Sequence, residues 1–301
     1  MKIIVTGGLG FIGSSFVRLL DSFPNIEIVI IDKCTYAADE SRVEGCHYEL
    51  IKKDICDVIL EDVIGAHYIV NFAAETHVDN SIKNGLPFIK SNVEGVFNLI
   101  EVARNVPTLE RFIQISTDEV YGDIERGIAY EEDPLKPSSY YSAAKASADM
   151  LILSAARTYN FPYLITRTCN NFGVNQDKEK FIPKILDCIE NRKSIPVYGK
   201  GDQVREWIWV EDNVAEIWKL ICENVSGIRN IGSRDRWRNI DIIEEIAKYS
   251  PKVPRFKYVA DRLGHDKRYA LRSDNTVTLL LSEFIKNYYG EENEEYQKKE
   301  A

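Results

Sequence analysis

Short apolar runs recur along the first half of the chain, and stretches with apolar residues at helical spacing separate them. Each run is rich in Ile, Val and Tyr and too short for a helix, so it predicts a buried strand. The stretches 92–104 and 142–159 predict helices between strands. Strands that alternate with helices indicate a parallel sheet covered by helices. The predicted strands are 2–6, 26–32, 48–52, 68–72, 111–116 and 163–167.

Beyond residue 168 the pattern loosens into shorter elements with more turn residues. We therefore predict an α/β fold in which a Rossmann-type doubly wound parallel sheet (residues 1–168) precedes a smaller C-terminal substrate-binding lobe (residues 169–301). Some exchange of chain between the two parts is expected. The C-terminal residues 290–301 are almost wholly charged or polar, and we expect them to fray.

A glycine-rich turn follows the first predicted strand, and an acid ends the second. The turn matches G-x-G-x-x-G through Gly8, Gly10 and Gly13, a pattern that lets backbone N–H groups approach a pyrophosphate at the start of a helix. Asp32 follows Gly13 by 19 residues, where its carboxylate can accept hydrogen bonds from a ribose diol. Together these features predict a dinucleotide site rather than a turn without a ligand. Asp32 favours NAD over NADP because it repels a 2′-phosphate, whereas Lys33 weakens that preference.

Composition narrows the classes of function. The chain has 301 residues, 45% of them hydrophobic, and no apolar run long enough to span a membrane. Its net charge of −9 disfavours binding to nucleic acid. The six cysteines form no C-x-x-C pair, so we interpret them as reduced cysteines of a cytoplasmic protein. The four histidines are widely spaced, and we expect no metal site.

Candidate catalytic residues follow the predicted strands, at the edge of the sheet where doubly wound folds bind their ligands. Thr117, Asp118 and Glu119 follow one strand. Tyr141 and Lys145, four residues apart, share one face of the long predicted helix, where the ammonium can lower the pKa of the phenol. Each pair also has an interpretation without a catalytic role. Tyr141 and Lys145 could form an exposed pair on a surface helix, and Asp118 and Glu119 could only cap a helix or face water.

The chain resembles the extended short-chain dehydrogenase/reductase superfamily and, within it, the dTDP-glucose 4,6-dehydratase family. The segment Thr117-Asp118-Glu119 favours the dehydratases, because related epimerases and decarboxylases usually carry other residues at the position of Asp118. Leu263 and Arg272 depart from the family pattern. The segments that carry the resemblance include TGGLGFIG, DKCTYA, KDICD, NFAAETHVDNSI, STDEVYGD, YSAAKASAD, RTCNNFG, EKFIP, VREWIWVED and DRLGHDKRYA.

The resemblance implies an internal redox cycle on a nucleotide sugar. Tyr141, helped by Thr117, would remove the proton of the C4 hydroxyl while NAD oxidises C4. Glu119 would take the C5 proton, and Asp118 would protonate the hydroxyl that leaves C6. Hydrogen would then return from the cofactor to C6, giving a 4-keto-6-deoxy sugar. Asp118 must stay protonated while Glu119 is ionised, so their environments must separate the two pKa values.

Two further groups of residues follow from the resemblance. Around NAD, with Tyr141 and Lys145, it implies Gly7, Gly10, Phe11, Ile12, Gly13, Asp32, Lys33, Thr35, Asp54, Ile55, Phe72, Ala73, Ala74, Ser91 and Asn171. Around the nucleotide sugar, with Arg205 and Arg268 as candidates to bind the diphosphate, it implies Thr76, Thr117, Asn170, Lys180, Pro196, Val197, Tyr198, Asn239 and His265.

Several alternatives stay open. One alternative is another NAD-dependent nucleotide-sugar epimerase or decarboxylase, which does not need Asp118 and Glu119 as an acid/base pair. The other is a catalytically silent NAD-binding regulator. The resemblance favours dTDP as the nucleotide of the substrate, and UDP and GDP are the alternatives. We expect a homodimer that pairs through the helices at 92–104 and 142–159.

Overall fold

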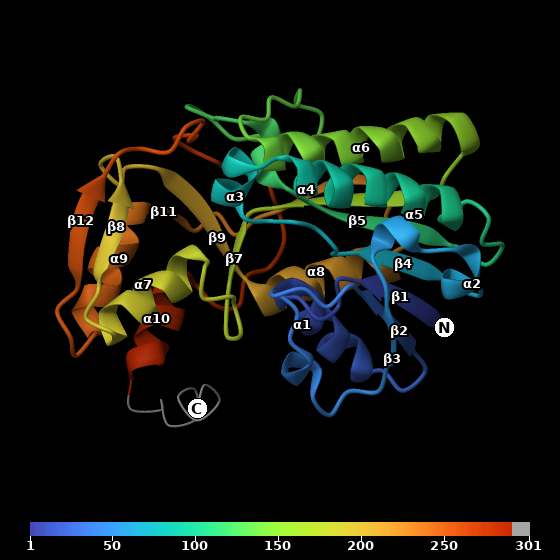
Figure 1. Cartoon of the computed structure of the whole chain (residues 1–301), viewed down its shortest axis with the longest axis horizontal. Coiled ribbons are helices and arrows are strands. Elements are labelled where there is room, and N and C mark those ends of the chain that lie inside the picture. Colours follow the sequence, from blue (N-terminus) through green and yellow to red (C-terminus); the bar gives the residue numbers. More distant parts are fainter. Residues whose placement is uncertain (291–301) are drawn as a thin grey trace.

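The computed structural model describes residues 1–290 and shows a large central sheet beside a smaller lobe (Figure 1). The predicted fraying of 290–301 therefore falls almost wholly outside the described residues. Six strands of the sheet match the predicted ones to within one residue at each end. The strands of the sheet are β1 (Lys2–Thr6), β2 (Glu27–Asp32), β3 (Glu49–Lys52), β4 (Tyr68–Asn71), β5 (Arg111–Thr117), β6 (Tyr163–Thr168) and β10 (Gly227–Ile231).

All seven strands run parallel, in the order β10-β6-β5-β4-β1-β2-β3. The order reverses between β1 and β4, which makes the carboxyl ends of these two strands the switch point of the sheet. The central strands are apolar on both faces, as a sheet covered by helices requires. The prediction of a Rossmann-type doubly wound sheet is confirmed.

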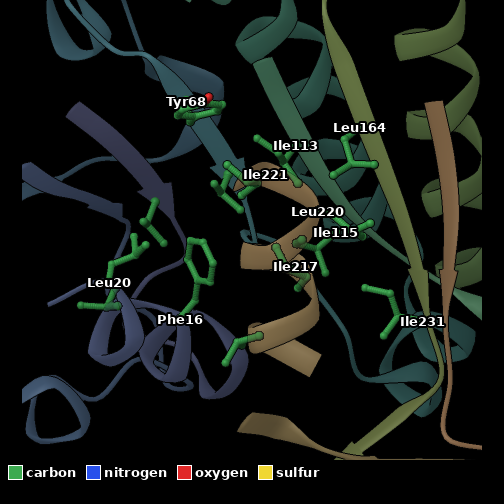
Figure 2. Packing of buried hydrophobic residues seen from close by; sticks show 14 of the residues in the cluster. Phe16, Leu20, Tyr68, Ile113, Ile115, Leu164, Ile217, Leu220, Ile221 and Ile231 are labelled. Atoms are coloured by element: carbon green, nitrogen blue, oxygen red, sulfur yellow. The ribbon is translucent and has the colours of Figure 1, made fainter. Parts of the chain in front are cut away.

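Helices cover both faces of this sheet. On one face, α1 (Phe11–Asp21) and α8 (Val210–Cys222) pack Phe16, Leu20 and Ile217 against the strands (Figure 2). On the other face, α5 (Gly95–Ala103) and α6 (Tyr140–Tyr159) form a second apolar cluster together with the short helix α2 (Leu60–Val63). The first predicted helix begins instead as α4 (Leu86–Ile89) and a π-helical turn, Lys90–Glu94, before α5.

The smaller lobe has two short sheets and its own apolar core. The chain returns from this lobe to the large sheet, because α8 packs against α1 and β10 pairs with β6. The elements outside the large sheet and its covering helices are α3 (Val78–Lys83), β7 (Asn170–Phe172), α7 (Phe181–Glu190), β8 (Ser194–Tyr198), β9 (Val204–Trp209), β11 (Arg236–Arg238), α9 (Asn239–Tyr249), β12 (Arg255–Val259) and α10 (Leu281–Tyr289). Among residues 1–290, no helix is both long and apolar enough to cross a bilayer.

A buried ion pair joins α6 to β6. The Arg167 Nε donates to Asp149 Oδ2 at 3.0 Å, and both side chains are almost fully excluded from solvent. Arg167 also donates to the Tyr121 hydroxyl at 2.9 Å, and that hydroxyl donates to Asn230 on β10. Because Asp149 lies one helical turn past Lys145, this pair fixes the part of α6 that carries the predicted site residues.

Replacing Asp149 alone should destabilise the fold strongly. Asp149→Leu leaves the Arg167 guanidinium buried without its carboxylate, so the free energy of unfolding should fall by about 3–5 kcal/mol. The double variant Asp149→Leu/Arg167→Met should recover most of that loss. Urea unfolding measures both changes, with Asp187→Ala, which breaks the exposed pair with Lys193, as the control. A single variant as stable as the parent would contradict this role of the pair.

Candidate active site

A cavity of about 490 Å³ opens between the two lobes, at the carboxyl ends of the central strands. Nearly all of the predicted site residues line it, although they come from many separate elements. The lining includes Gly7, Gly10, Phe11, Ile12, Gly13, Asp32, Lys33, Thr35, Asp54, Ile55, Phe72, Ala73, Ala74, Thr76, Ser91, Thr117, Glu119, Tyr141, Lys145, Asn170, Asn171, Lys180, Pro196, Val197, Tyr198, Arg205, Asn239 and His265.

Gly8 of the glycine motif does not line the cavity, and neither do two of the residues predicted around the cofactor and the sugar. Asp118 is buried beside it, next to Thr117 and Glu119. Arg268 lies elsewhere: its guanidinium donates to the carbonyl oxygens of Ile124 and Gly127, each at 2.9 Å. This arrangement holds the loop before α6 and does not direct Arg268 to the cavity.

Some lining residues were not selected from the sequence. Arg262 faces the cavity and lies 3.4 Å from Asp79. Arg262 belongs to the segment DRLGHDKRYA that carries the family resemblance. Its positive charge within that segment could therefore have identified it as a candidate diphosphate ligand. Its neighbour Leu263 is highly exposed. Other lining residues without a prediction include Tyr36, Glu75, His77, Asp79 and Tyr269.

The glycine turn between β1 and α1 leaves no room for side chains. Gly7 has a φ of +69°, and a Cβ there would lie 2.6 Å from the backbone nitrogen of Ala73. A Cβ on Gly13 would overlap the carbonyl oxygen of Gly7. Helix α1 begins after Gly10 with no side-chain cap and no acid in its first turn. Its first N–H groups, which lack intrahelical partners, are therefore suited to an anion.

Backbone N–H groups hold the carboxylate of Asp32, the residue that ends β2. Asp32 Oδ2 accepts from the N–H of Leu9 at 3.1 Å, and Oδ1 accepts from the N–H of Cys34 at 2.8 Å. Each carboxylate oxygen keeps a lone pair for a ligand hydroxyl. The ammonium of neighbouring Lys33 lies 3.7 Å from Asp54 and 3.4 Å from Glu75. Its charge is therefore directed to two acids, which favours a ribose diol over a 2′-phosphate at Asp32.

The π-helical turn before α5 forms part of the cavity wall. It places Ser91 in the lining and turns Asn92 toward the loop after β4. The Asn92 side chain accepts from the N–H of Glu75 at 2.8 Å and donates to the carbonyl oxygen of Glu75 at 2.9 Å. These two bonds fix the small residues Ala73 and Ala74, which leave space for a flat ligand.

Strand β5 ends in Thr117, and a 3₁₀ helix, Asp118–Tyr121, begins directly after it. The Thr117 hydroxyl caps this helix by accepting from the N–H of Glu119 at 3.3 Å. The same hydroxyl donates to Asp118 Oδ1 at 3.2 Å. The cap thus positions the two carboxyl groups at the end of the strand.

Different neighbours surround these two carboxyl groups. Burial, then the negative charges of Glu119 and Glu206, raise the pKa of Asp118 well above its ordinary value, although Arg205 opposes them. Burial also raises the pKa of Glu119, but the positive charges of Arg205 and Arg262 both oppose it. These surroundings favour a proton on Asp118 and a negative charge on Glu119.

Tyr141 and Lys145 are buried on the face of α6 that lines the cavity. Burial, together with Glu119 and Asp118, raises the pKa of the Tyr141 phenol. This direction is opposite to the predicted lowering by Lys145, because burial and the two carboxyl groups determine it. Burial lowers the pKa of Lys145 to about 8, against the carboxylate of Asp149. The Lys145 ammonium donates to the carbonyl oxygen of Ile115.

Contacts between the lobes cross the cavity. Lys180 of the smaller lobe donates to the Thr76 hydroxyl at 2.9 Å. Its neighbour Glu179 accepts from the Tyr36 hydroxyl at 3.2 Å and lies 3.8 Å from the His77 ring. The segment before α7 is therefore tied to loops after β2 and β4.

The far end of the cavity carries the positive charge of Arg205. Its guanidinium donates to the carbonyl oxygens of Val204 and Asp266 at 2.9 and 2.8 Å, and it lies 4.2 Å from the centre of the Tyr269 ring. These contacts fix a buried cation near Glu119, where it can attract an anionic ligand.

Comparison with known proteins agrees with this geometry. The "NAD dependent epimerase/dehydratase family" matches residues 3–232. The low-salt glycan biosynthesis protein Agl12 of Haloferax volcanii is 44% identical, over 93% of this chain and 92% of that protein. A probable dTDP-glucose 4,6-dehydratase of Sinorhizobium fredii is 38% identical, over 93% of this chain and 87% of that protein.

A solved structure is also similar to this chain in sequence and in fold. It is DesIV, a dTDP-glucose 4,6-dehydratase from Streptomyces venezuelae with NAD and TYD bound, which is 33% identical with a TM-score of 0.90 and covers 98% of each chain. The family match spans most of the chain and includes the glycine turn, the end of β5 and the Tyr141–Lys145 face of α6. The chain belongs to the NAD-dependent epimerase/dehydratase family.

Proposed function

We propose that this protein is an NAD-dependent nucleotide-sugar 4,6-dehydratase that acts on dTDP-glucose. One observation carries the proposal: an acid/base pair, Asp118 and Glu119, lies beside Thr117 and Tyr141 at the end of β5. Oxidation at C4 of the sugar needs the Tyr141 phenol and Lys145, and epimerisation needs no further acid or base. Elimination of water also needs a base for C5 and an acid for the leaving hydroxyl. The relatives named dTDP-glucose 4,6-dehydratase support the same reaction and nucleotide.

The residues that line the cavity fit NAD. The uncapped start of α1 and the lack of side chains at Gly7 and Gly10 suit the pyrophosphate, and Asp32 suits the adenosine ribose. Lys145 would hold the nicotinamide ribose. Bound NAD supplies a positive charge, which favours the phenolate form of Tyr141, and an acceptor for the hydrogen that leaves C4 with its two electrons and returns at C6.

The protein residues then move protons in a fixed order. Tyr141 takes the proton of the C4 hydroxyl, which Thr117 orients. The resulting C4 ketone acidifies the C5 hydrogen, and Glu119 removes it as a proton. Asp118, the protonated carboxyl, gives its proton to the hydroxyl that leaves C6 as water. We assign this step to Asp118 Oδ2, which is buried without a hydrogen-bond partner in residues 1–290.

We assign the nucleotide to the smaller lobe. Arg205, Arg262 and Lys180 supply positive charge for the diphosphate, and Arg262 takes the place first given to Arg268. Around the base and its sugar we place Asn170, Pro196, Val197, Tyr198, Asn239 and His265.

The assembly that fits is a homodimer in the cytoplasm. Ile89, Phe97 and Met150, on α4, α5 and α6, expose apolar side chains that pairing of these helices would cover. All six cysteines are free thiols, which suits a reducing compartment.

Gly13→Ala should weaken NAD binding. The added Cβ meets the Gly7 carbonyl, so the turn has to move, and we expect affinity to fall at least about tenfold, or about 1.4 kcal/mol. Calorimetry with NAD measures this change. The matched control is Gly45→Asn: a Cβ there has open space, the φ is +82°, and Asn adopts this left-handed region more readily than most residues, so this variant should bind NAD like the parent. Unchanged affinity in Gly13→Ala would refute the assignment of the glycine turn.

Labelled substrates separate the candidate reactions. When dTDP-, UDP- and GDP-glucose carry deuterium at C4, the proposal predicts a product of dTDP-glucose that has lost water and carries the label at C6. Mass spectrometry and NMR detect both features. An epimerase would instead give a product with the label at C4 and no loss of water, and a regulator would give no product.

Glu119→Gln should separate oxidation from elimination. Without a base for C5, we expect reduced NAD to accumulate on addition of substrate while formation of the 4-keto-6-deoxy product falls at least roughly 100-fold. Absorbance of the reduced cofactor and product analysis measure the two steps. Glu125→Gln, an exposed change on the following loop, serves as the control. Elimination at the parent rate would remove Glu119 from the role of base.

A further inference from the structure

Arg205 is a buried cation without an acid of its own. It is 6% exposed, and its hydrogen bonds go to the backbone carbonyl oxygens of Val204 and Asp266. Among residues 1–290, no carboxylate forms an ion pair with it. A buried guanidinium without an opposite charge is unfavourable, so this site favours an anionic ligand. The proposed function places the diphosphate of the substrate here, and the inference below rests on that function.

Asp266 supports this cation without forming an ion pair with it. Its backbone carbonyl oxygen accepts from Arg205 Nη2 at 2.8 Å, while its carboxylate bonds to other groups. Carboxylate Oδ2 accepts from the Tyr269 hydroxyl at 2.7 Å, and the ring of Tyr269 lies beneath the Arg205 guanidinium. The carbonyl and the ring therefore hold the guanidinium and leave its other N–H groups to a ligand.

The second oxygen of the same carboxylate reaches the start of α6. The Ser138 hydroxyl donates to Asp266 Oδ1 at 2.6 Å. The next residue, Ser139, is the N-cap of α6, and its hydroxyl accepts from the N–H of Ser142 at 3.1 Å. Tyr141 is the second residue of this helix. The bond between Ser138 and Asp266 therefore helps to fix the beginning of the helix that carries Tyr141.

Asp266 acts from outside the cavity. It is 7% exposed and does not line the cavity, so a role in direct contact with substrate does not fit. The chain around it is held on both sides. The N–H of Val204 donates to the carbonyl oxygen of Lys267 at 2.7 Å, and a Cβ on Gly264 would lie 2.7 Å from the carbonyl oxygen of Ser138. The carboxylate thus bridges two fixed parts of the chain, β9 and the segment before α6.

We infer that Asp266 is a positioning residue that links the diphosphate site at Arg205 to the placement of Tyr141 on α6. A diphosphate bound to Arg205 restrains the Asp266 carbonyl and the Tyr269 ring. The Asp266 carboxylate passes this restraint to Ser138 and so to the first turn of α6. The nucleotide thereby contributes to kcat as well as to affinity, although it lies away from the sugar carbons that react.

Hydrogen exchange of the NAD-loaded protein reads this link without catalysis. In the parent, saturating dTDP should slow exchange at the amides of Ser142 and Ala143, both of which bond to Ser139. Asp266→Asn keeps the shape of the side chain but removes its charge and one acceptor, so this slowing should be lost. Lys267→Gln, a change at the exposed neighbouring side chain, is the matched control and should behave like the parent. If UDP or GDP binds instead of dTDP, that nucleotide is used.

Affinity and turnover give a second readout. In Asp266→Asn, the dissociation constant of dTDP should rise and kcat with dTDP-glucose should fall, each at least roughly tenfold. Ser138→Ala breaks only the bond toward α6, so kcat should fall by a similar factor while the affinity for dTDP stays within about threefold of the parent. Calorimetry and steady-state kinetics measure the two quantities, and NAD affinity should not change in either variant.

Two results would overturn the inference. One is an Asp266→Asn variant that unfolds at lower temperature but keeps the parent values of kcat and dTDP affinity, because the carboxylate would then only stabilise the fold. The other is slowing by dTDP that is missing in the parent or persists in Ser138→Ala, a variant that also serves if Asp266→Asn fails to fold. A parent that shows the slowing but makes no 4-keto-6-deoxy product would refute the proposed function and support the link.

Discussion

The constraint on which the rest of the structure depends is the reversal of strand order between β1 and β4. Parallel strands that diverge on either side of this point leave a crevice at their carboxyl ends, where loop residues from separate parts of the chain meet. The glycine turn after β1 and the acid at the end of β2 lie on one side of it. The residues after β4 and β5 lie on the other, so one cavity receives both the cofactor motifs and the reactive side chains.

Much of this arrangement could be predicted from local sequence. Short apolar runs located six strands to within one residue; five of these strands are largely buried, whereas β3 lies at the edge of the sheet and is partly exposed. Strand β10 escaped prediction because its sequence, GIRNI, contains a glycine, an arginine and an asparagine, and it joins the sheet from a distant part of the chain. Pairing with β6 makes it a strand, and that contact is not visible in a local pattern.

The site was predictable where a motif sets the geometry and less so where side-chain packing decides. Tyr141 and Lys145 lie on one buried face because helical spacing requires it. Arg268 binds backbone carbonyls instead of facing the cavity, since an arginine has many possible partners within its reach. The direction of the Tyr141 pKa shift was also missed, because burial and two neighbouring carboxyl groups depend on the tertiary fold.

The contacts of Lys180 and Glu179 with Thr76 and Tyr36 join the two lobes across the cavity that they line. Separation of the lobes along this line requires both bonds to break, so the two bonds resist opening of the cavity.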